Sequence, residues 1–502
     1  MNKKQLVEYI KKEKWDVQRA RAAIFAVDLA YTQYAQIDLD FLPGVTYSPL
    51  FCHFAVGNDD PFTQIINQKY VQGIAEKIYR DYLKNRKTIE RIIKDSRQLE
   101  KKLDNVWDRF QKNESASNDE LAQYFQEAIT ISKKWWQYNA LMENKGEVID
   151  VKIIPELAKK HGWKIDYARE VVSVLAHPEK QSDLNQERID FLKICLGVAK
   201  NKKRENIGLP QLIAEYIQKY FWIKSDFCRA IIISPGKLIK ETENEINNKK
   251  IIGIKKELSG MLKNFKAIET RKRRLLNKLS LDETDLKKIE FAQKSIFWLD
   301  ERKRQMMKQL YYLFCFLEKI AERFEISFED LSFYYYGEIA QLLESGHSLS
   351  MDVSAKRRQE TFAMYERSKP STYFYGQEAR ELLNVATYIE KTKEIKGMVA
   401  SRGKSARVAG VVKIIHDPSK AKFKTGEILV TSMTRVEFVP LMRKARAIIA
   451  DEGGLACHAA IVSRELNLPA IIGTKNATEI LKDGDEVELD MRTGEIKILK
   501  SK

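Results

Sequence analysis

One stretch near the end of the chain, GGLACHAAIVSRELNLPAIIGT at residues 453–474, constrains the fold more than any other. An apolar run that ends at Ala450 predicts a buried strand before it, and the segment after His458 predicts a helix. Gly453 and Gly454 form the turn between them, where the absence of a Cβ lets the backbone approach a ligand closely. The pattern therefore places an imidazole at a helix N-terminus, where backbone N–H groups and the helix dipole favour an anion such as phosphate.

The stretch resembles the phosphohistidine signature of the phosphoenolpyruvate (PEP)-utilising enzymes, the family of pyruvate phosphate dikinase and PEP synthase. The family pattern is two glycines, three residues, a histidine, two alanines, two aliphatic residues, a small residue and an arginine. The matching residues here are Gly453, Gly454, His458, Ala459, Ala460, Ile461, Val462, Ser463 and Arg464. Further similarity along the flanks implies that residues 396–502 form the family's mobile, or swivelling, domain. One position departs from the pattern, because Ala456 stands where the family usually has threonine or serine.

The resemblance implies that His458 carries a phosphoryl group. Neutral imidazole suits this role, because it is nucleophilic near neutral pH and releases the phosphoryl again. A silent copy of the domain and an unrelated buried histidine remain alternatives. Gly453 and Gly454 would leave room for the phosphate, and Cys457 is expected to fill the turn rather than act as a second nucleophile.

Two further side chains are candidates for a supporting role. Thr434 follows a predicted strand at 428–432, where the family's corresponding loop faces the histidine, so its hydroxyl is a candidate hydrogen-bond partner for the imidazole or the phosphate. Arg464 lies six residues after His458, nearly two helical turns away, and is expected to pack or to form a salt bridge. The six histidines show no metal-ligand spacing, so no metal site is predicted.

Composition limits the class of protein. With 22 glycines and 11 prolines in 502 residues, helix breakers are sparse, which favours long helices in several domains. The net charge of +17 indicates solvated helix faces, with a nucleic-acid or acidic-partner surface as alternatives. Trp135, Trp136 and Trp222 are expected to pack between helices. Five scattered cysteines, no apolar signal core and no apolar run of about 18 residues favour a cytoplasmic protein without a membrane span.

Apolar spacing predicts an α+β protein with a large, mostly helical region before the mobile domain. This region is divided into three predicted ranges, 1–118, 119–280 and 281–395. Ser117 and Glu120 predict a capping box at the start of a helix. Long helical segments are predicted at 62–110, as one helix or a broken antiparallel pair, and at 236–278 and 282–324.

From residue 396 the period changes to that of short strands joined by glycine turns, with one or two helices between them. This composition agrees with the β/β/α character that the resemblance implies. The predicted strands are 410–415, 428–432, 445–450, 470–473, 486–491 and 495–499.

The remainder of the chain shows neither a glycine-rich nucleotide loop nor the strand and helix alternation of a PEP-binding barrel. We therefore expect a phosphotransfer component whose His458 is phosphorylated by a separate ATP- or PEP-binding protein and then serves an unidentified acceptor. Mg²⁺ and the nucleotide or PEP would bind to that partner, and no cofactor is assigned to this chain. A regulatory or scaffold protein with a non-catalytic swivelling domain, and a helical nucleic-acid-binding protein, are the alternatives.

Overall fold

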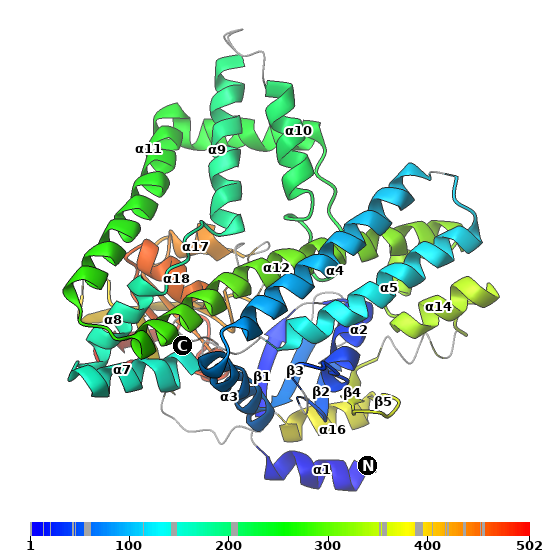
Figure 1. Ribbon diagram of the computed structural model, residues 1–502, viewed down its shortest axis with the longest axis horizontal. Coiled ribbons are helices and arrows are strands. Elements are labelled where there is room, and N and C mark those ends of the chain that lie inside the picture. The colour runs from blue at the N-terminus through cyan, green and yellow to red at the C-terminus, as the bar shows by residue number, and fades with distance from the viewer. Residues whose placement is uncertain are drawn as a thin grey trace.

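The computed structural model of this chain has the predicted α+β architecture, with a large, mostly helical region followed by a strand-rich C-terminal domain (Figure 1). The structure describes residues 3–501 apart from 14, 21, 43–44, 46, 55–61, 114, 142–147, 202–208, 351–352, 354–358, 387–394, 404, 417, 419–420, 435–437, 452 and 454–456.

Residues 3–386 are called the body below. Its helices are α1 (Lys3–Lys12), α2 (Ile24–Ala35), α3 (Gln68–Lys84), α4 (Lys87–Lys112), α5 (Asn118–Ala140), the π-helix η1 (Ile149–Ile153), α7 (Ile154–His161), α8 (Ile165–Leu175), α9 (Asp183–Asn201), α10 (Leu209–Tyr220), α11 (Pro235–Lys278), α12 (Glu283–Arg323), α13 (Phe328–Leu331), α14 (Tyr336–Ser345) and α16 (Gln377–Ala386). One hydrophobic core runs from Ala23 to Tyr365 and draws on all three predicted ranges, whose division into separate domains remains a prediction.

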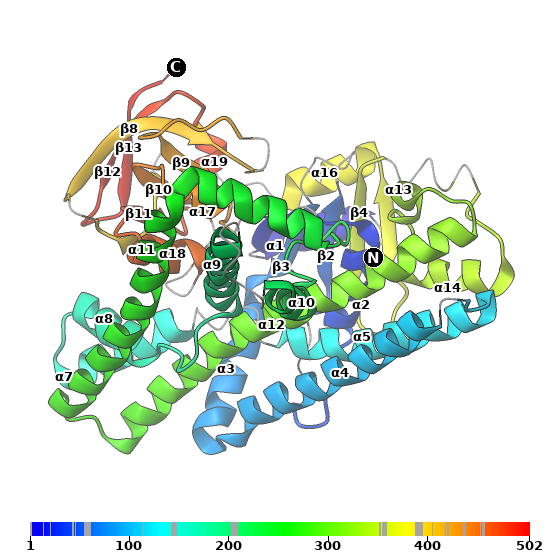
Figure 2. The same cartoon turned by 90° about the horizontal axis from the view of Figure 1, so that it is seen from above.

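Helix α12 is the central helix of the body and packs against the hairpin that α4 and α5 form (Figure 2). Asp282 caps its start, since its carboxylate accepts the backbone N–H of Asp285 at 2.9 Å and Asp285 returns the contact. The predicted capping box at the start of α5 is present, with Ser117 Oγ and the Glu120 carboxylate exchanging hydrogen bonds with backbone N–H groups. The starts of both helices therefore follow from local sequence.

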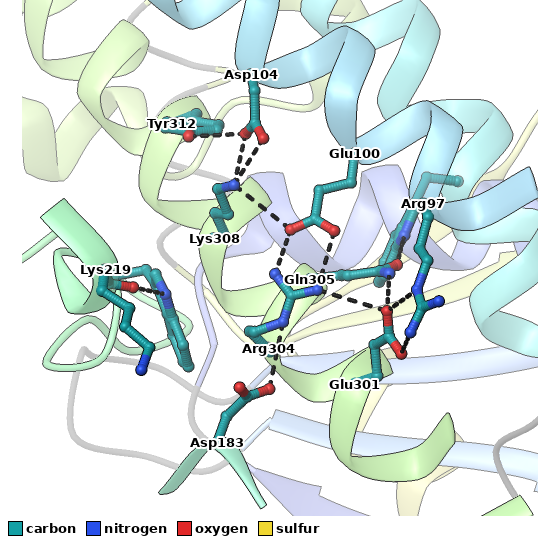
Figure 3. A network of polar contacts seen from close by, with 12 residues as sticks. Arg97, Glu100, Asp104, Asp183, Lys219, Glu301, Arg304, Gln305, Lys308 and Tyr312 are labelled. Carbon is teal, nitrogen blue, oxygen red and sulfur yellow. Dashed lines mark hydrogen bonds and ion pairs between the residues drawn. The ribbon is translucent and has the colours of Figure 1, made fainter. Parts of the chain in front are cut away.

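A row of ion pairs also joins α4 to α12 (Figure 3). Two carboxylates of this row, Glu100 and Glu301, have side chains that are only 13% and 7% exposed. The pairs are Arg97 with Glu301, at 2.5 Å between Nε and Oε1, Arg304 with both oxygens of Glu100, and Lys308 with Asp104, at 2.7 Å between Nζ and Oδ1. Because Glu100 and Glu301 are largely withdrawn from water, these two carboxylates depend on their cationic partners.

The body is mostly helical, as predicted, but it also contains strands that were not predicted, and the predicted helix at 62–110 is wrong in its first residues, which form a strand. A five-stranded antiparallel sheet of order β1-β3-β2-β4-β5 lies within it. Helix α2 contacts one side of the sheet, and α1 and α16 pack with a separate apolar cluster that includes Phe51, Ile65 and Phe362. Its strands are β1 (Trp15–Ala20), β2 (Leu50–Phe54), β3 (Phe62–Asn67), β4 (Thr361–Tyr365) and β5 (Thr372–Tyr375).

These strands were not predicted from the sequence, because β2, β3 and β4 are buried on both faces and show no alternation of polar and apolar residues. In particular, Ile66 lies in β3 and not at the start of a long helix. The helical part of the segment predicted at 62–110 begins only with α3 at Gln68. A break at Asn85 and Arg86 separates α3 from α4.

The Lys-rich segment predicted at 236–278 is the helix α11, which bends at Lys250, where φ is 54°. Three of its side chains, Leu238, Thr242 and Ile254, are buried, and the rest are half-buried or exposed. The excess of lysine in this segment thus lies on a largely solvated helix, as its composition predicts.

The C-terminal domain contains all six predicted strands and two short ones that were not predicted, β6 and β7. The strand order is β6-β13-β12-β8-β9-β10-β11-β7, and β8 to β11 run parallel to one another. Its elements are β6 (Ile395–Lys396), β7 (Met398–Ser401), β8 (Arg407–Ile414), β9 (Ile428–Thr431), α17 (Val439–Met442), β10 (Ala447–Ala450), α18 (His458–Glu465), β11 (Ala470–Ile472), α19 (Ala477–Ile480), β12 (Glu486–Asp490) and β13 (Glu495–Lys500).

The central strands of this domain are buried on both faces, and their side chains alternate between two cores. Val430 and Ile449 pack with Leu489 in a core that β12 and β13 close. Leu429 and Ile448 point the other way and pack with residues of α17 and α18. The result is a β/β/α layering that fixes α18 on one face of the parallel strands.

Candidate functional site

Helix α18 begins where the parallel strands end. Strand β10 finishes at Ala450, and the chain turns through Gly453 and Cys457 before His458 starts the helix. The carboxyl edge of parallel strands is where ligands bind in open α/β sheets, and a helix N-terminus there adds a favourable field for anions. The backbone of His458 therefore has the predicted position, while its side chain and the whole of Gly454 lie outside the described parts of the chain.

Cys457 is the N-cap of α18. Its Sγ accepts a hydrogen bond from the backbone N–H of Ala460 at 3.4 Å, and burial raises the pKa of the thiol. A thiol held protonated in this way is a poor nucleophile, which agrees with a structural role in the turn. Gly453 has a φ of 129°, and a Cβ there would lie 2.7 Å from Cys457 Sγ.

The variant Gly453→Ala should therefore destabilise the start of α18 by about 2 kcal/mol, through backbone strain and through contact with Cys457. Calorimetric unfolding of the full chain should show the loss. Gly426→Ala is the matched control, because φ is 93° there but no atom lies within 4 Å of the added Cβ. The double variant Gly453→Ala/Cys457→Ala should recover the part of the loss that comes from contact. If Gly453→Ala and Gly426→Ala lose the same stability, and Gly453→Ala/Cys457→Ala recovers none of it, this explanation is wrong.

Thr434 lies at the same edge of the sheet, after β9, and is 7% exposed. It lines the same cleft as Gly453 and Cys457, so these three predicted residues border one cleft. Sequence analysis missed Lys475, which follows β11, is exposed and lines this cleft with a φ of 70°. The signal for it is its place after a predicted strand, since the carboxyl ends of parallel strands meet at one edge.

Asp451 fixes the loop that carries Lys475. It accepts a hydrogen bond from Thr474 Oγ1 at 2.9 Å and another from the backbone N–H of Thr478 at 3.2 Å. Its own backbone carbonyl accepts the N–H of Lys475 at 3.0 Å. The loops after β10 and β11 thus form one rigid edge beside α18.

Arg464 lies inside the C-terminal domain, and its Nε donates to the carbonyl oxygen of Ala400 in β7 at 3.0 Å. Burial lowers the pKa of its guanidinium, and the charge of Arg169 in α8 acts in the same direction, while Cys457 and Asp150 of η1 oppose it. Asp150 also acts on Cys457. Charged groups of the body therefore lie close to the start of α18, which no sequence motif indicated.

A cleft of about 3940 Å³ separates the C-terminal domain from the body. Its walls include Thr434, Gly453 and Cys457 on one side and parts of α2, α5, α8, α9, α11 and α12 on the other. Figure 2 shows the C-terminal domain beside α8, α9 and α11. An ion pair between described residues crosses the junction, with Arg443 Nη2 at 4.0 Å from Glu257 Oε1. The candidate site thus opens toward a large space that the body encloses.

Within the described residues, no group of three histidine, cysteine, aspartate or glutamate side chains is arranged to hold a metal ion. A search of the described helices finds none with the length and apolar character needed to span a membrane.

Comparison with known proteins matches residues 423–494 to the family "PEP-utilising enzyme, mobile domain". A probable phosphoenolpyruvate synthase of Staphylothermus marinus is 50% identical over 111 residues, which are 22% of this chain and 13% of that protein. The phosphoenolpyruvate synthase of Escherichia coli (strain K12) is 47% identical over 88 residues, 17% of this chain and 11% of its own.

A third relative, the uncharacterized phosphotransferase YvkC of Bacillus subtilis, is 38% identical over 181 residues, 34% of this chain and 21% of its own. This match is longer than the C-terminal domain and so includes residues of the body. The chain spans less than a quarter of the length of each of these relatives. The C-terminal region of this chain is a mobile domain of the PEP-utilising enzyme family.

Proposed function

We propose that this chain is a phosphotransfer protein that carries a phosphoryl group on His458. A separate ATP- or PEP-binding protein, with its Mg²⁺, phosphorylates the imidazole. The group then passes to an acceptor with a hydroxyl bound in the cleft. In that step the hydroxyl oxygen bonds to phosphorus as the P–N bond breaks, the electron pair returns to the ring nitrogen, and the hydroxyl proton ends on the imidazole.

The observation that supports this proposal is the position of α18. Its first residue follows β10 at the carboxyl edge of the parallel strands, where Thr434 and Lys475 follow β9 and β11, and Thr434, Gly453 and Lys475 line the cleft. A phosphoryl group at a helix N-terminus is stabilised there by the helix dipole, and Lys475 adds a positive charge. The names of the relatives, PEP synthase and phosphotransferase, support transfer of phosphoryl groups as the general chemistry.

The donor is proposed to be a separate protein because the sequence carries neither a nucleotide loop nor a barrel. The test is to incubate the purified chain with ATP labelled in a defined phosphate, or with labelled PEP, in the presence and absence of a candidate partner. We expect a label on this chain that is labile in acid and stable in base, and that depends on the partner. A regulatory or scaffold role predicts no label under any of these conditions, and that outcome would reject the carrier function.

A further inference from the structure

The second half of α11, residues 251–278, runs along the outside of the body (Figure 1). Its two acidic residues, Glu257 and Glu269, are half-buried. The Glu257 carboxylate is paired within the body, with Arg188 at 3.0 Å and with Lys249 at 2.7 Å. The exposed charged side chains of this stretch are therefore all positive, and they belong to Lys255, Lys256, Lys263, Lys266, Arg271, Arg273, Arg274 and Lys278.

Seven of these eight cations have no anionic partner within the described parts of the chain. The eighth, Arg271, pairs with Glu170 of α8, whereas the others make no ion pair and no side-chain hydrogen bond with a described residue. Some of them also repel one another, because Arg274 lies four residues before Lys278 and like charges at that spacing destabilise a helix. An anionic surface bound here would remove this repulsion.

The seven cations, called the basic face below, lie opposite the side of α11 that packs on the body. Apolar residues at spacings of three and four define that inner side, and each of them is buried or half-buried. They are Ile254, Leu258, Met261 and Phe265. With a rise of 1.5 Å per residue, the basic face is about 33 Å long from Lys256 to Lys278.

Apolar side chains are exposed among these charges. Ile252, four residues before Lys256, is 83% exposed, and Leu262 is 45% exposed. Phosphates offer such side chains no contact, whereas protein interfaces bury them. The stretch 251–278, which is described throughout, also exposes no aromatic ring for stacking on bases, since Phe265 is on the inner side. The basic face therefore fits an acidic protein surface with apolar contacts better than it fits a nucleic acid.

The helix that carries the basic face adjoins the C-terminal domain. On its inner side, Glu257 Oε1 lies 4.0 Å from Arg443 Nη2 of that domain, and Met261 and Asn264 line the cleft. An α-helix with its side chains is about 10 Å across. A protein bound to the basic face would thus lie one helix away from the junction between the body and the domain that carries α18.

We propose that the basic face of α11 docks an acidic, partly apolar surface of a partner protein, and that this partner is the protein that phosphorylates His458. Complementary charge speeds the encounter of the two proteins and disfavours wrong partners. Burial of Ile252 and Leu262 then stabilises the complex. The role of the partner as phosphoryl donor rests on the proposed function, whereas the docking surface itself does not.

Binding is tested on the full, unphosphorylated chain by titration calorimetry. The probe is a synthetic amphipathic helix that carries glutamate and leucine on one face. The variant Lys256→Glu/Lys263→Glu/Arg274→Glu should bind this peptide at least about tenfold more weakly, and its α11 should persist because glutamate is as good a helix former as lysine. No binding of the peptide by the wild-type chain, or equal binding by the variant, would overturn the proposal.

The matched control is Lys87→Glu/Lys101→Glu/Lys112→Glu, which makes the same change in net charge on exposed residues of α4. This control should bind the peptide as the wild type does, and an equal loss in both variants would show that only net charge matters. Duplex DNA is the second probe, and the two variants should not differ in binding it. A loss of DNA binding confined to the α11 variant would assign the basic face to nucleic acid and overturn the proposal.

A labelling experiment separates the docking surface from the carrier function. Phosphoramidate, a small phosphoryl donor that needs no docking, should label His458 equally in the wild type and in the α11 variant. With the donor protein, the variant should need at least about tenfold more donor for half-maximal labelling. An unchanged requirement for the donor protein rejects the docking surface and leaves the carrier function standing. Binding of the peptide without any label on His458 from either donor supports the surface and rejects the carrier function.

Discussion

Replacing His458 by alanine should reduce the acid-labile phosphoryl label on this chain to background. Imidazole is the nucleophile in the proposed step, and neither the hydroxyl of Thr434 nor the buried thiol of Cys457 forms a phosphoramidate in its place. The fold should persist, because the start of α18 depends on the Cys457 cap and on Gly453 rather than on the ring. Circular dichroism should therefore match the wild type while the label is lost.

The matched control is His416→Ala, which removes an exposed histidine from the same domain. This variant should keep the label, and Cys457→Ser should also keep it, because serine is a good N-cap. Retention of an acid-labile label in His458→Ala would place the phosphoryl group elsewhere. Loss of the label in His416→Ala as well would show that the assay reports the state of the domain rather than its nucleophile.

The C-terminal domain could be predicted because local signals define it. Its strands are short apolar runs bounded by glycine, and the turn with Gly453 leads directly into α18. Lys475 could have been found in the same way, because it follows β11 at the edge where β10 also ends. Its left-handed backbone, however, is unusual for a residue other than glycine and has no local sequence signal.

The body was harder to predict because its decisive contacts join residues that are far apart in the chain. Strand β2 pairs with β3 nearby but also with β4, about 300 residues later, and no local pattern predicts such a partner. The approach of Asp150 and Arg169 to Arg464 likewise depends on tertiary structure. The cleft also follows from tertiary structure, since its walls come from elements that are far apart in the sequence.

A second large effect, on stability, is expected at the ion pairs between α4 and α12, where Arg304 pairs with three carboxylates (Figure 3). It donates to both oxygens of Glu100, its Nε lies 3.2 Å from Asp183 Oδ2, and its Nη2 lies 3.6 Å from Glu301 Oε1. Arg304→Ala leaves the three carboxylates, of which Glu100 and Glu301 are nearly buried, without their shared cation and should cost about 3 kcal/mol. Unfolding in urea can be followed by tryptophan fluorescence, because all seven tryptophans lie in the body.

The control is Arg86→Ala, which removes an arginine that also links to α12, through Glu283 and Glu290 at 3.6 Å each. The Arg86 side chain is 46% exposed, so its removal should cost less than about 1 kcal/mol. Equal losses in Arg304→Ala and Arg86→Ala would show that burial does not strengthen the row of ion pairs.

The stability lost in Arg304→Ala should also depend on pH. The pKa of Asp183 determines whether this loss grows or shrinks as the pH rises. Burial raises the pKa of Asp183 to about 6, and Arg304 opposes this rise. A raised pKa on an acid means that the folded state holds the proton more tightly, so its contribution to stability is present at low pH and is lost as the pH rises through the folded pKa. Without Arg304 that folded pKa rises further, and more stability is lost on the alkaline side. The difference in unfolding free energy between wild type and Arg304→Ala should therefore be larger at about pH 8 than at about pH 5. A difference that does not change with pH would contradict the half-buried carboxylate of Asp183 as the cause.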